Sequence, residues 1–505
     1  MLRYFCFIFL ISFNLSLFSQ SYIGFGADNF NGVHGILTNP ANIADSRSLV
    51  DINLASASIF TTNSYFELDY YGLLVDDEIE FEEQSTRVGV DRINYGALNI
   101  DILGPSVLIS LSDKHSIALS TRARGIANIN NADGEVVNFF ENEDIREITE
   151  PLIANDVNAS AIVNTWIEYG ITYARVLNDN KRHFLKGGAT LKYLSGYGSG
   201  QGETDDVLLA YSPNNNAVDN VLFRGDVSYN YSSNLDSNEN FIPFEGDDNF
   251  EFKETTWGVG LDLGLVYEYR PNHRQNISRS NVKEQVVIRH KSTYKYKVGL
   301  SILDIGALNY RDSREANANL NDINIDTLLD GDFDEEVKPA LGVTDQLVDQ
   351  RILLPTTIRA DIDIKLKDKF YLNTTSRLSL YSKNNTRANR TVNQVTVSPR
   401  YETKWFTAFS PITYTQFGGV QWGLGGRLGP IFIGSSGAIS HILIDNQTRA
   451  FDVYAGIKIP IFHKTPKPRA EDDPTGGYKS DCNGCLEKDK KQPTKPLGHY
   501  NGLVK

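Results

Sequence analysis

The chain has 505 residues, a formal net charge of −14 and a mean hydropathy of −0.31. This acidic balance disfavours a nucleic-acid partner, because nucleic-acid binding relies on Lys and Arg to neutralise phosphates. After residue 20 no apolar stretch reaches the ~18 residues of a membrane helix. The 25 Tyr and 26 Phe residues suit the aromatic girdles of a protein that crosses a membrane with alternating strands.

The first segment, residues 1–20, has the pattern of a secretory signal peptide. Arg3 supplies the positive charge, residues 5–17 are the apolar core, and residues 18–20 form a cleavage region. The alternative is an uncleaved membrane anchor, but the apolar run is short and contains Asn14 and Ser16. We therefore expect export, with residues 21–48 as a lead-in that is rich in Gly, Asn and Ala and does not alternate.

Residues 257–269 are the clearest strand. Odd positions carry Trp, Val, Leu and Tyr, whereas even positions are mostly Gly, Asp and Glu. Successive strand side chains point to opposite faces, so one face is apolar with aromatic residues at both ends. Trp257 to Tyr267 would span roughly 33 Å, or roughly 25 Å of height after tilting, which matches the apolar band of an outer-membrane barrel strand. The apolar face would then contact lipid, and the Gly/Asp face would line a lumen.

One alternating strand also fits a soluble β-sandwich, so the prediction rests on repetition. Similar runs recur from residue 50 to residue 462, and Asp368-Lys369 is one of the short turns between them. The sequence therefore predicts an all-β, transmembrane, antiparallel up-and-down β-barrel over residues 49–462. We count about fourteen strands, with twelve to sixteen as the range, because the first third alternates weakly.

Several polar segments are expected to be loops. Residues 198–217 and 232–250 would be extracellular, with short strands at 207–211 and 221–231, and residues 311–349 would be the longest loop. In the strand that begins near residue 294, the alternation places Tyr294 on the lipid side and Lys295 in the lumen.

The last strand alternates up to Phe462, and a final amphipathic strand ending in an aromatic residue is what barrel-insertion machinery recognises. Residues 463–505 are Pro- and Lys-rich and read as a disordered periplasmic tail. An even barrel would place both termini on the periplasmic side of a Gram-negative outer membrane, with membrane lipid as a partner.

Few residues have the pattern of a chemical site. Cys482 and Cys485 lack a second ligand pair for zinc and a following His for haem, so we expect a local disulfide or two thiols without a role. The adjacent pairs His115-Ser116 and Ser440-His441 resemble polar turns more than the centre of an embedded hydrolase. We expect no catalytic residue, no metal, no cofactor and no enzyme activity.

The predicted lumen is the best candidate for function. Its charges are either the lining of a polar conduit or cross-strand ion pairs that fill the interior. The predicted lumen-facing residues are Arg122, Arg124, Lys186, Asp262, Lys295, Lys297, Arg359, Asp361, Asp363, Lys365, Arg400 and Arg427, together with Lys192, Lys367 and Arg377.

Two short stretches resemble known barrels. Residues 35–41, Gly-Ile-Leu-Thr-Asn-Pro-Ala, resemble the start of the long-chain fatty-acid transporter superfamily, which includes the shuttle barrel of type IX secretion. The same stretch, with residues 299–306 and 428–435, resembles a Bacteroidota family of outer-membrane barrels without an assigned function. By this resemblance, residues 21–48, with Asn39, Pro40, Ala41 and Asn42, would be a hatch that plugs the lumen. A Gly-rich coil at membrane depth needs such an enclosure to satisfy its backbone.

Two functional hypotheses follow. The first is a plugged channel or transporter for small, partly apolar solutes. The second is a non-enzymatic accessory or scaffold barrel of a secretion or surface-protein assembly, with those proteins as partners.

Overall fold

The computed structural model describes residues 21–69, 85–141, 150–180, 182–212, 221–235, 254–271, 277–279, 285–287, 293–320, 342–444 and 447–463. The predicted signal peptide, the tail after residue 463 and both cysteines of the tail lie outside these residues. No helix among the described residues is long and apolar enough to cross a membrane.

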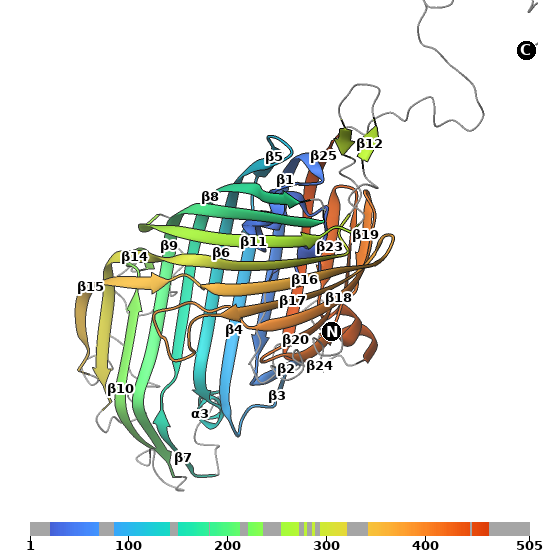
Figure 1. The fold of residues 1–505 in the computed structure, drawn as a ribbon. Coiled ribbons are helices and arrows are strands. Elements are labelled where there is room, and N and C mark those ends of the chain that lie inside the picture. The colour runs from blue at the N-terminus through green and yellow to red at the C-terminus, as the bar shows by residue number, and fades with distance from the viewer. Residues whose placement is uncertain are drawn as a thin grey trace, which may run out of the picture. The chain divides into compact units, whose positions relative to one another are not determined.

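The strands form one antiparallel sheet that closes on itself as a transmembrane barrel of 14 strands (Figure 1). Closure is made by β1 and β25, which pair from Ser48↔Phe462 to Thr62↔Ala450. In order around the wall the strands are β1 (Ser48–Asn63), β4 (Ile93–Leu103) with β5 (Ser106–Ser110), β6 (His115–Asp133), β8 (Ser160–Asn180) with β7 (Leu152–Val157), β9 (His183–Tyr211), β11 (Thr256–Tyr269) with β10 (Val221–Tyr231), β14 (Tyr296–Asn319), β16 (Thr357–Lys367) with β15 (Thr344–Leu353), β17 (Phe370–Ser379), β18 (Gln394–Glu402), β19 (Phe406–Phe409) with β20 (Ile412–Thr415), β21 (Gly419–Trp422) with β22 (Leu424–Leu428), β23 (Ile431–Ser435) and β25 (Ala450–Phe462).

The two ends of the barrel differ. At the short-turn end β1 begins, β25 ends, and tight turns join β8 to β9 and β16 to β17. The opposite, long-loop end carries small elements outside the barrel wall. They are β2 (Phe66–Asp69), β3 (Ser85–Arg87) and β24 (Gln447–Thr448) in one sheet, α3 (Gly134–Phe140), η5 (Ser233–Leu235) and a π-turn, η8 (Ser440–Ile444). A hairpin of β12 (Ile277–Arg279) and β13 (Gln285–Val287) follows β11 and forms its own unit.

Several strands are longer than predicted. Residues 198–211 of the expected loop 198–217 are a continuation of β9, which pairs with β10 up to Tyr211↔Val221. Likewise β14 runs to Asn319 and β15 begins at Thr344, so part of the expected loop 311–349 is paired sheet. A strand can be polar on both faces where both faces of the sheet meet water. Such a strand has the same composition as a loop, so the sequence alone predicted a loop.

The alternation of β11 has the predicted direction. Trp257 and Leu265 are about half exposed on the outer surface, at 59% and 50%, whereas Asp262 and Glu268 are buried inside. Tyr294, which the alternation placed outside, is instead buried and donates to Asp363. The reason is that β14 begins at Tyr296, so Tyr294 precedes the strand and does not obey its alternation.

A charge on the outer face should destabilise the barrel in proportion to its depth. Leu263 lies at the middle of β11, whereas Leu347 lies opposite Arg314, beyond the point at which β11 ends against β14. We expect Leu263→Arg to lower the free energy of unfolding by about 2–4 kcal/mol and Leu347→Arg by about 0–1 kcal/mol. Urea titration of protein folded into lipid vesicles measures both. Equal costs would contradict a lipid-facing outer surface.

Candidate functional site

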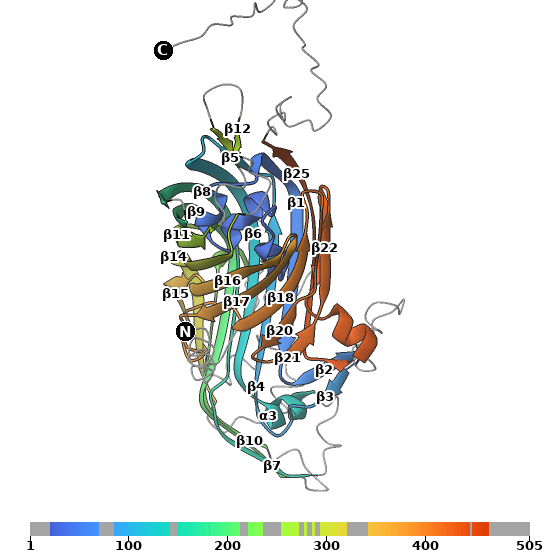
Figure 2. The same ribbon diagram turned by 45° about the vertical axis from the view of Figure 1, so that its right-hand side comes forward.

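The N-terminal segment, residues 21–47, lies against inward-facing side chains of the barrel. It contains three short 3₁₀ turns, η1 (Phe25–Ala27), η2 (Gly32–Leu37) and η3 (Pro40–Ile43), which lie within the ring of strands (Figure 2). Tyr22 and Phe25 pack on Phe409, Phe432 and Tyr454 of one wall. Val33, Ile36, Ile43 and Ala44 of the segment pack on Leu103, Leu108, Ala118 and Ala174 of another wall. Two apolar faces thus hold the segment to different parts of the barrel.

Asn39 connects the segment to the backbone of the wall. Its side-chain oxygen accepts from the Ala41 N–H and caps η3, a role typical of Asn. Its side-chain nitrogen donates to the carbonyl oxygens of Leu265 in β11 and Leu300 in β14, at 3.0 and 3.1 Å. One side chain therefore forms hydrogen bonds with the backbone of a turn in the segment and with the backbone of two strands.

Glycines in the strands make room for this contact. A Cβ atom on Gly264 would lie 2.0 Å from the Asn39 side-chain oxygen, and one on Gly188 would lie 2.6 Å from the carbonyl carbon of Pro40. The small residues on the inward face of β11 and β9 thus form the seat of residues 39–40.

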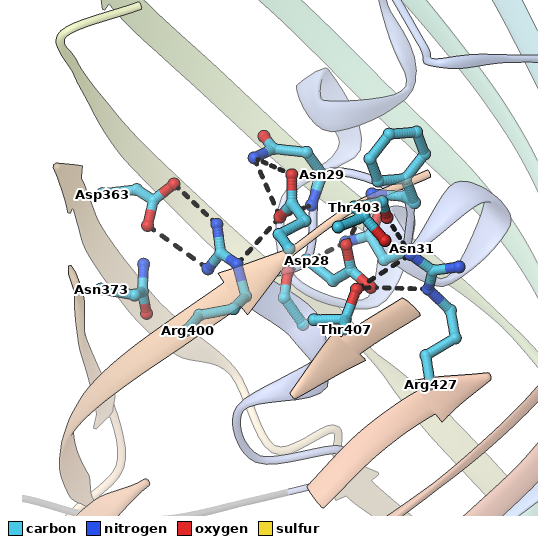
Figure 3. A network of polar contacts seen from close by, with 12 residues as sticks. Asp28, Asn29, Asn31, Asp363, Asn373, Arg400, Thr403, Thr407 and Arg427 are labelled. Carbon is cyan, nitrogen blue, oxygen red and sulfur yellow. Dashed lines mark hydrogen bonds and ion pairs between the residues drawn. The ribbon is translucent and has the colours of Figure 1, made fainter. Parts of the chain in front are cut away.

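A polar network holds the first turn (Figure 3). The Arg427 Nε donates to Asp28 Oδ2 at 2.8 Å, and the Thr407 hydroxyl donates to the same oxygen. Burial alone would raise the pKa of Asp28, but the Arg427 guanidinium holds that pKa below its ordinary value. Beside it, Asn29 donates to Glu402, which also accepts from Arg400. Asp28 is therefore an ionised carboxylate in a dry site.

A second network joins the segment to the closure of the barrel. Lys458 of β25 makes an ion pair of 2.9 Å with Asp51 of β1 and also donates to the Phe30 carbonyl oxygen. Asp51 accepts from the Val33 N–H at 3.0 Å. Gly32 has φ +63° and a Cβ there would lie 2.0 Å from the Asp51 carboxylate, so this position requires glycine.

His34 is buried at the centre of the segment. Its ring contacts Tyr22, Phe25 and Phe432, and its Nε2 is 2.9 Å from the Ser56 hydroxyl. Burial and the nearby Lys458 ammonium lower the pKa of His34 to about 3. The imidazole is therefore neutral at physiological pH.

Ion pairs form a layer across the wall from β4 to β14. Lys192 Nζ lies 2.9 Å from Asp262 and 2.6 Å from Asp304. Arg124 pairs with Asp304 and with Glu168, at 2.9 and 3.1 Å. Arg122 pairs with Asp101 and Glu168. Because these charges are buried, each is stable only with its partners in place.

An apolar layer lies next to these charges. It consists of buried inward-facing side chains from five strands and from the connection between β15 and β16, and Tyr310 donates from it to Asn164 at 2.7 Å. Its members are Ile126, Ile162, Trp166, Leu194, Leu308, Tyr310, Ile352 and Leu354. The Trp166 indole donates to Glu168 at 2.9 Å and so joins the apolar layer to the ion pairs.

One strand of the wall is irregular beside the segment, although hydrogen bonds still join it to both neighbouring strands. The second barrel strand breaks at Gly104-Pro105, between β4 and β5, and the buried Asn53 amide donates to the Leu103 and Gly104 carbonyl oxygens at 2.8 and 2.9 Å. On the outer surface the break borders a groove of about 640 Å³ lined largely by apolar side chains, including Leu119, Ile171 and Leu191. The apolar packing of the segment on Leu103 and Leu108 lies on the inner side of the same wall.

The predicted lumen-facing residues divide into three groups. Lys295 is exposed at the short-turn end, before β14 begins, and its ammonium group donates to the Lys365 carbonyl oxygen, so its placement in the lumen was wrong. Lys367 is likewise exposed at the end of β16, whereas Asp361, Lys365 and Arg377 are half-buried and Lys192 is buried. The remaining residues are buried or nearly so, and several share ion pairs or hydrogen bonds: Arg122, Arg124, Lys186, Asp262, Lys297, Arg359, Asp363, Arg400 and Arg427.

Sequence reasoning missed the acidic partners Asp101, Glu168 and Asp304 and the whole apolar layer. Asp101 and Glu168 alternate in phase with the inward residues of their own strands and were detectable by that signal, whereas Asp304 lies at a bulge that shifts the alternation of β14. The apolar layer was not detectable, because an apolar residue in alternating sequence is assigned to the lipid side.

Three members of the two Ser/His pairs have ordinary partners, and the Ser116 hydroxyl is buried without one among the described residues. His115 Nδ1 is 2.7 Å from the Tyr173 hydroxyl, and the Ser440 hydroxyl accepts from the Trp422 N–H. His441 lies 3.0 Å from the Gln421 amide.

Filling the glycine seat should displace the segment. We expect Gly264→Ala to raise the thiol-labelling rate of a cysteine placed at Asn42 by about tenfold, equivalent to about 1.4 kcal/mol. Gly200→Ala is the control, because a Cβ there meets nothing within 4 Å. Equal labelling in both variants would contradict the seat.

The buried histidine should make stability depend on pH. The pKa of His34 is about 3 when folded and about 6.5 when unfolded. The unfolded chain therefore binds more protons than the folded chain between these pH values. The contribution of His34 to the free energy of unfolding consequently falls as the pH falls. From pH 7 to pH 4.5, urea unfolding should show a larger loss of stability in the wild type than in His34→Gln. Equal losses would exclude a neutral, buried His34.

Comparison with solved structures finds proteins described as toluene transporters and a FadL homologue. The toluene transporter TbuX of Ralstonia pickettii is 10% identical with a TM-score of 0.40, covering 86% of this chain and 95% of that one. A FadL homologue of Pseudomonas aeruginosa is 11% identical with a TM-score of 0.38, covering 88% and 98%. The toluene transporter TodX of Pseudomonas putida is 8% identical with a TM-score of 0.36, covering 88% and 99%. At these identities the likeness concerns the fold alone.

No curated protein matches the sequence. A family described as a family of unknown function, DUF5723, matches residues 40–436, which span β1 to β23 and the end of the N-terminal segment. The chain belongs to this family.

Proposed function

We propose that the protein is a plugged outer-membrane channel for small, partly apolar solutes, with residues 21–47 as the plug. The observation that carries the proposal is how this segment is held. Side chains, rather than sheet pairing, attach it to β1, β11, β14, β22 and β25 through Asp51, Asn39, Arg427 and Lys458. Contacts of this kind can be exchanged without opening the barrel wall, since the strand pairing of β1 with β25 does not involve them.

The layers around the segment support a partly apolar solute. The apolar layer offers eight buried side chains that a hydrocarbon group can contact. The ion-pair layer beside it offers hydrogen-bonding partners for a polar group. We propose that a solute released by the segment leaves toward the membrane near Gly104-Pro105, where the strand is irregular and an apolar groove lies on the outer surface.

The orientation follows from the loops. We place the short-turn end in the periplasm, because outer-membrane barrels have short periplasmic turns and longer extracellular loops. The plug and both ends of the barrel chain are then periplasmic, and the signal peptide and the tail keep the roles predicted from the sequence.

Loosening the plug should increase uptake. Asn39→Ala removes a cap and two hydrogen bonds to the wall, a loss of about 2 kcal/mol, and should raise uptake of the uncharged dye N-phenyl-1-naphthylamine by intact cells several-fold. Asn42→Ala is the matched control, because among the described residues that amide bonds only within the segment, to Gly35 and Thr38.

A host that makes the wild-type protein should also take up more dye than one that lacks it. If neither the wild type nor Asn39→Ala raises uptake, and the purified protein carries stoichiometric partner chains, the channel is excluded and the scaffold hypothesis replaces it.

A further inference from the structure

Two arginines lie directly opposite each other inside the barrel. Arg359 of β16 and Arg377 of β17 are Cα partners in the strand register. Arg359 is 8% exposed and Arg377 is half-buried. Directly opposed like charges destabilise a sheet, because their Cβ atoms are only about 5 Å apart. The pair therefore needs a compensating charge.

No carboxylate among the described residues forms an ion pair with either arginine, and only longer-range attraction reaches them, from Asp361 for Arg359 and from Asp304 for Arg377. Among the described residues, neither guanidinium makes a hydrogen bond or an ion pair, and the Nε of Arg359 is buried without a partner. Several other inward cations differ: Arg124, Lys192, Arg400, Arg427 and Lys458 each pair with a carboxylate. Buried charges normally form ion pairs, so two neighbouring arginines without an ion-pair partner are unusual.

The nearest carboxylate along the strand is turned away from Arg377. Asp361 follows Arg359 by two residues, but its carboxylate lies over Gly299 of β14, where a Cβ would be 2.4 Å from its Oδ1. β14 flanks β16 on the side opposite to β17. Asp361 and Arg359 do not form an ion pair.

Neutral hydrogen-bonding groups line the other side. Gln394 of β18 is the Cα partner of Arg377. Its amide donates to Thr396 and Thr413, whose hydroxyls are 3.1 Å apart. Arg359 also approaches the plug, since a Cβ on Gly26 would lie 3.5 Å from its Nη2. The site thus offers two guanidinium groups and hydroxyls without a carboxylate on the β17–β18 side.

We infer that Arg359 and Arg377 bind a small oxyanion, a phosphate or a carboxylate, either free or carried by a solute. The planar guanidinium fork matches the two oxygens of such groups, and a bound anion removes the repulsion between the arginines. Binding itself is independent of transport. The conclusion that the permeating solute is anionic rests on the proposed function.

The test uses the full-length protein in detergent at constant ionic strength, with chloride replaced by inorganic phosphate or by acetate and with glycerol as a neutral additive. We expect phosphate or acetate, but not glycerol, to raise the thermal unfolding midpoint. Arg377→Gln should weaken the apparent affinity at least tenfold. Arg351→Gln is the control, because Arg351 is an exposed arginine on the outer side of β15.

A second readout separates binding from a structural role. Without phosphate, Arg377→Gln should raise the unfolding midpoint, since it relieves the repulsion, whereas loss of a merely structural residue would lower it. The inference would be overturned if neither phosphate nor acetate changed the unfolding midpoint of the wild type. It would also be overturned if these anions raised the midpoint equally in Arg377→Gln and Arg351→Gln. Stabilisation by anions without dye uptake would overturn the channel hypothesis but not the anion site. Dye uptake without stabilisation by anions would overturn the anion site but not the channel hypothesis.

Discussion

The closure of β1 on β25 is the constraint on which the rest of the structure depends. Lipid offers no hydrogen bonds, so a sheet at membrane depth has to pair every strand, and only a closed sheet does so. Closure leaves an interior in which the inward side chains find partners only among one another and on whatever enters the barrel. The ion pair of Asp51 and Lys458 lies at this closure, and the same two side chains bind the backbone of the N-terminal segment at Val33 and Phe30.

The interior is divided by chemistry rather than filled uniformly. Carboxylates and cations alternate across β4 to β14, where Lys192, Asp262 and Asp304 lie within ion-pair distance. The apolar layer around Trp166 and Tyr310 excludes water beside them and thereby strengthens the same ion pairs. On the β16–β17 wall the balance changes, because Arg359 and Arg377 have no such partners among the described residues. An amphipathic anion would meet an apolar surface and a positive charge on neighbouring parts of one interior.

Small residues in the strands leave space for the N-terminal segment. The inward glycines of β9 and β11 leave room for Asn39 and Pro40, and Asn39 uses that proximity to reach two strand carbonyls. A segment held by a few directed hydrogen bonds and ion pairs is stable when all are formed, and it loses several of them together when it moves. This cooperativity is what the proposed plug requires, because a plug is either seated or released.

The sequence by itself determined the barrel, its approximate strand number and the faces of its best strands. Alternation in β11 is sufficient for this, because a strand has only two faces and lipid accepts only one kind of side chain. The tertiary structure alone decided which charges meet, since Arg359 and Arg377 are 18 residues apart in the chain and become neighbours only through the register of β16 and β17. It also decided that Tyr294 turns inward to Asp363, that Lys295 remains outside, and that the side chains of the apolar layer face the interior. An alternating pattern records polarity, but an inward apolar residue and a lipid-facing one have the same polarity, and only the neighbours across the barrel distinguish them.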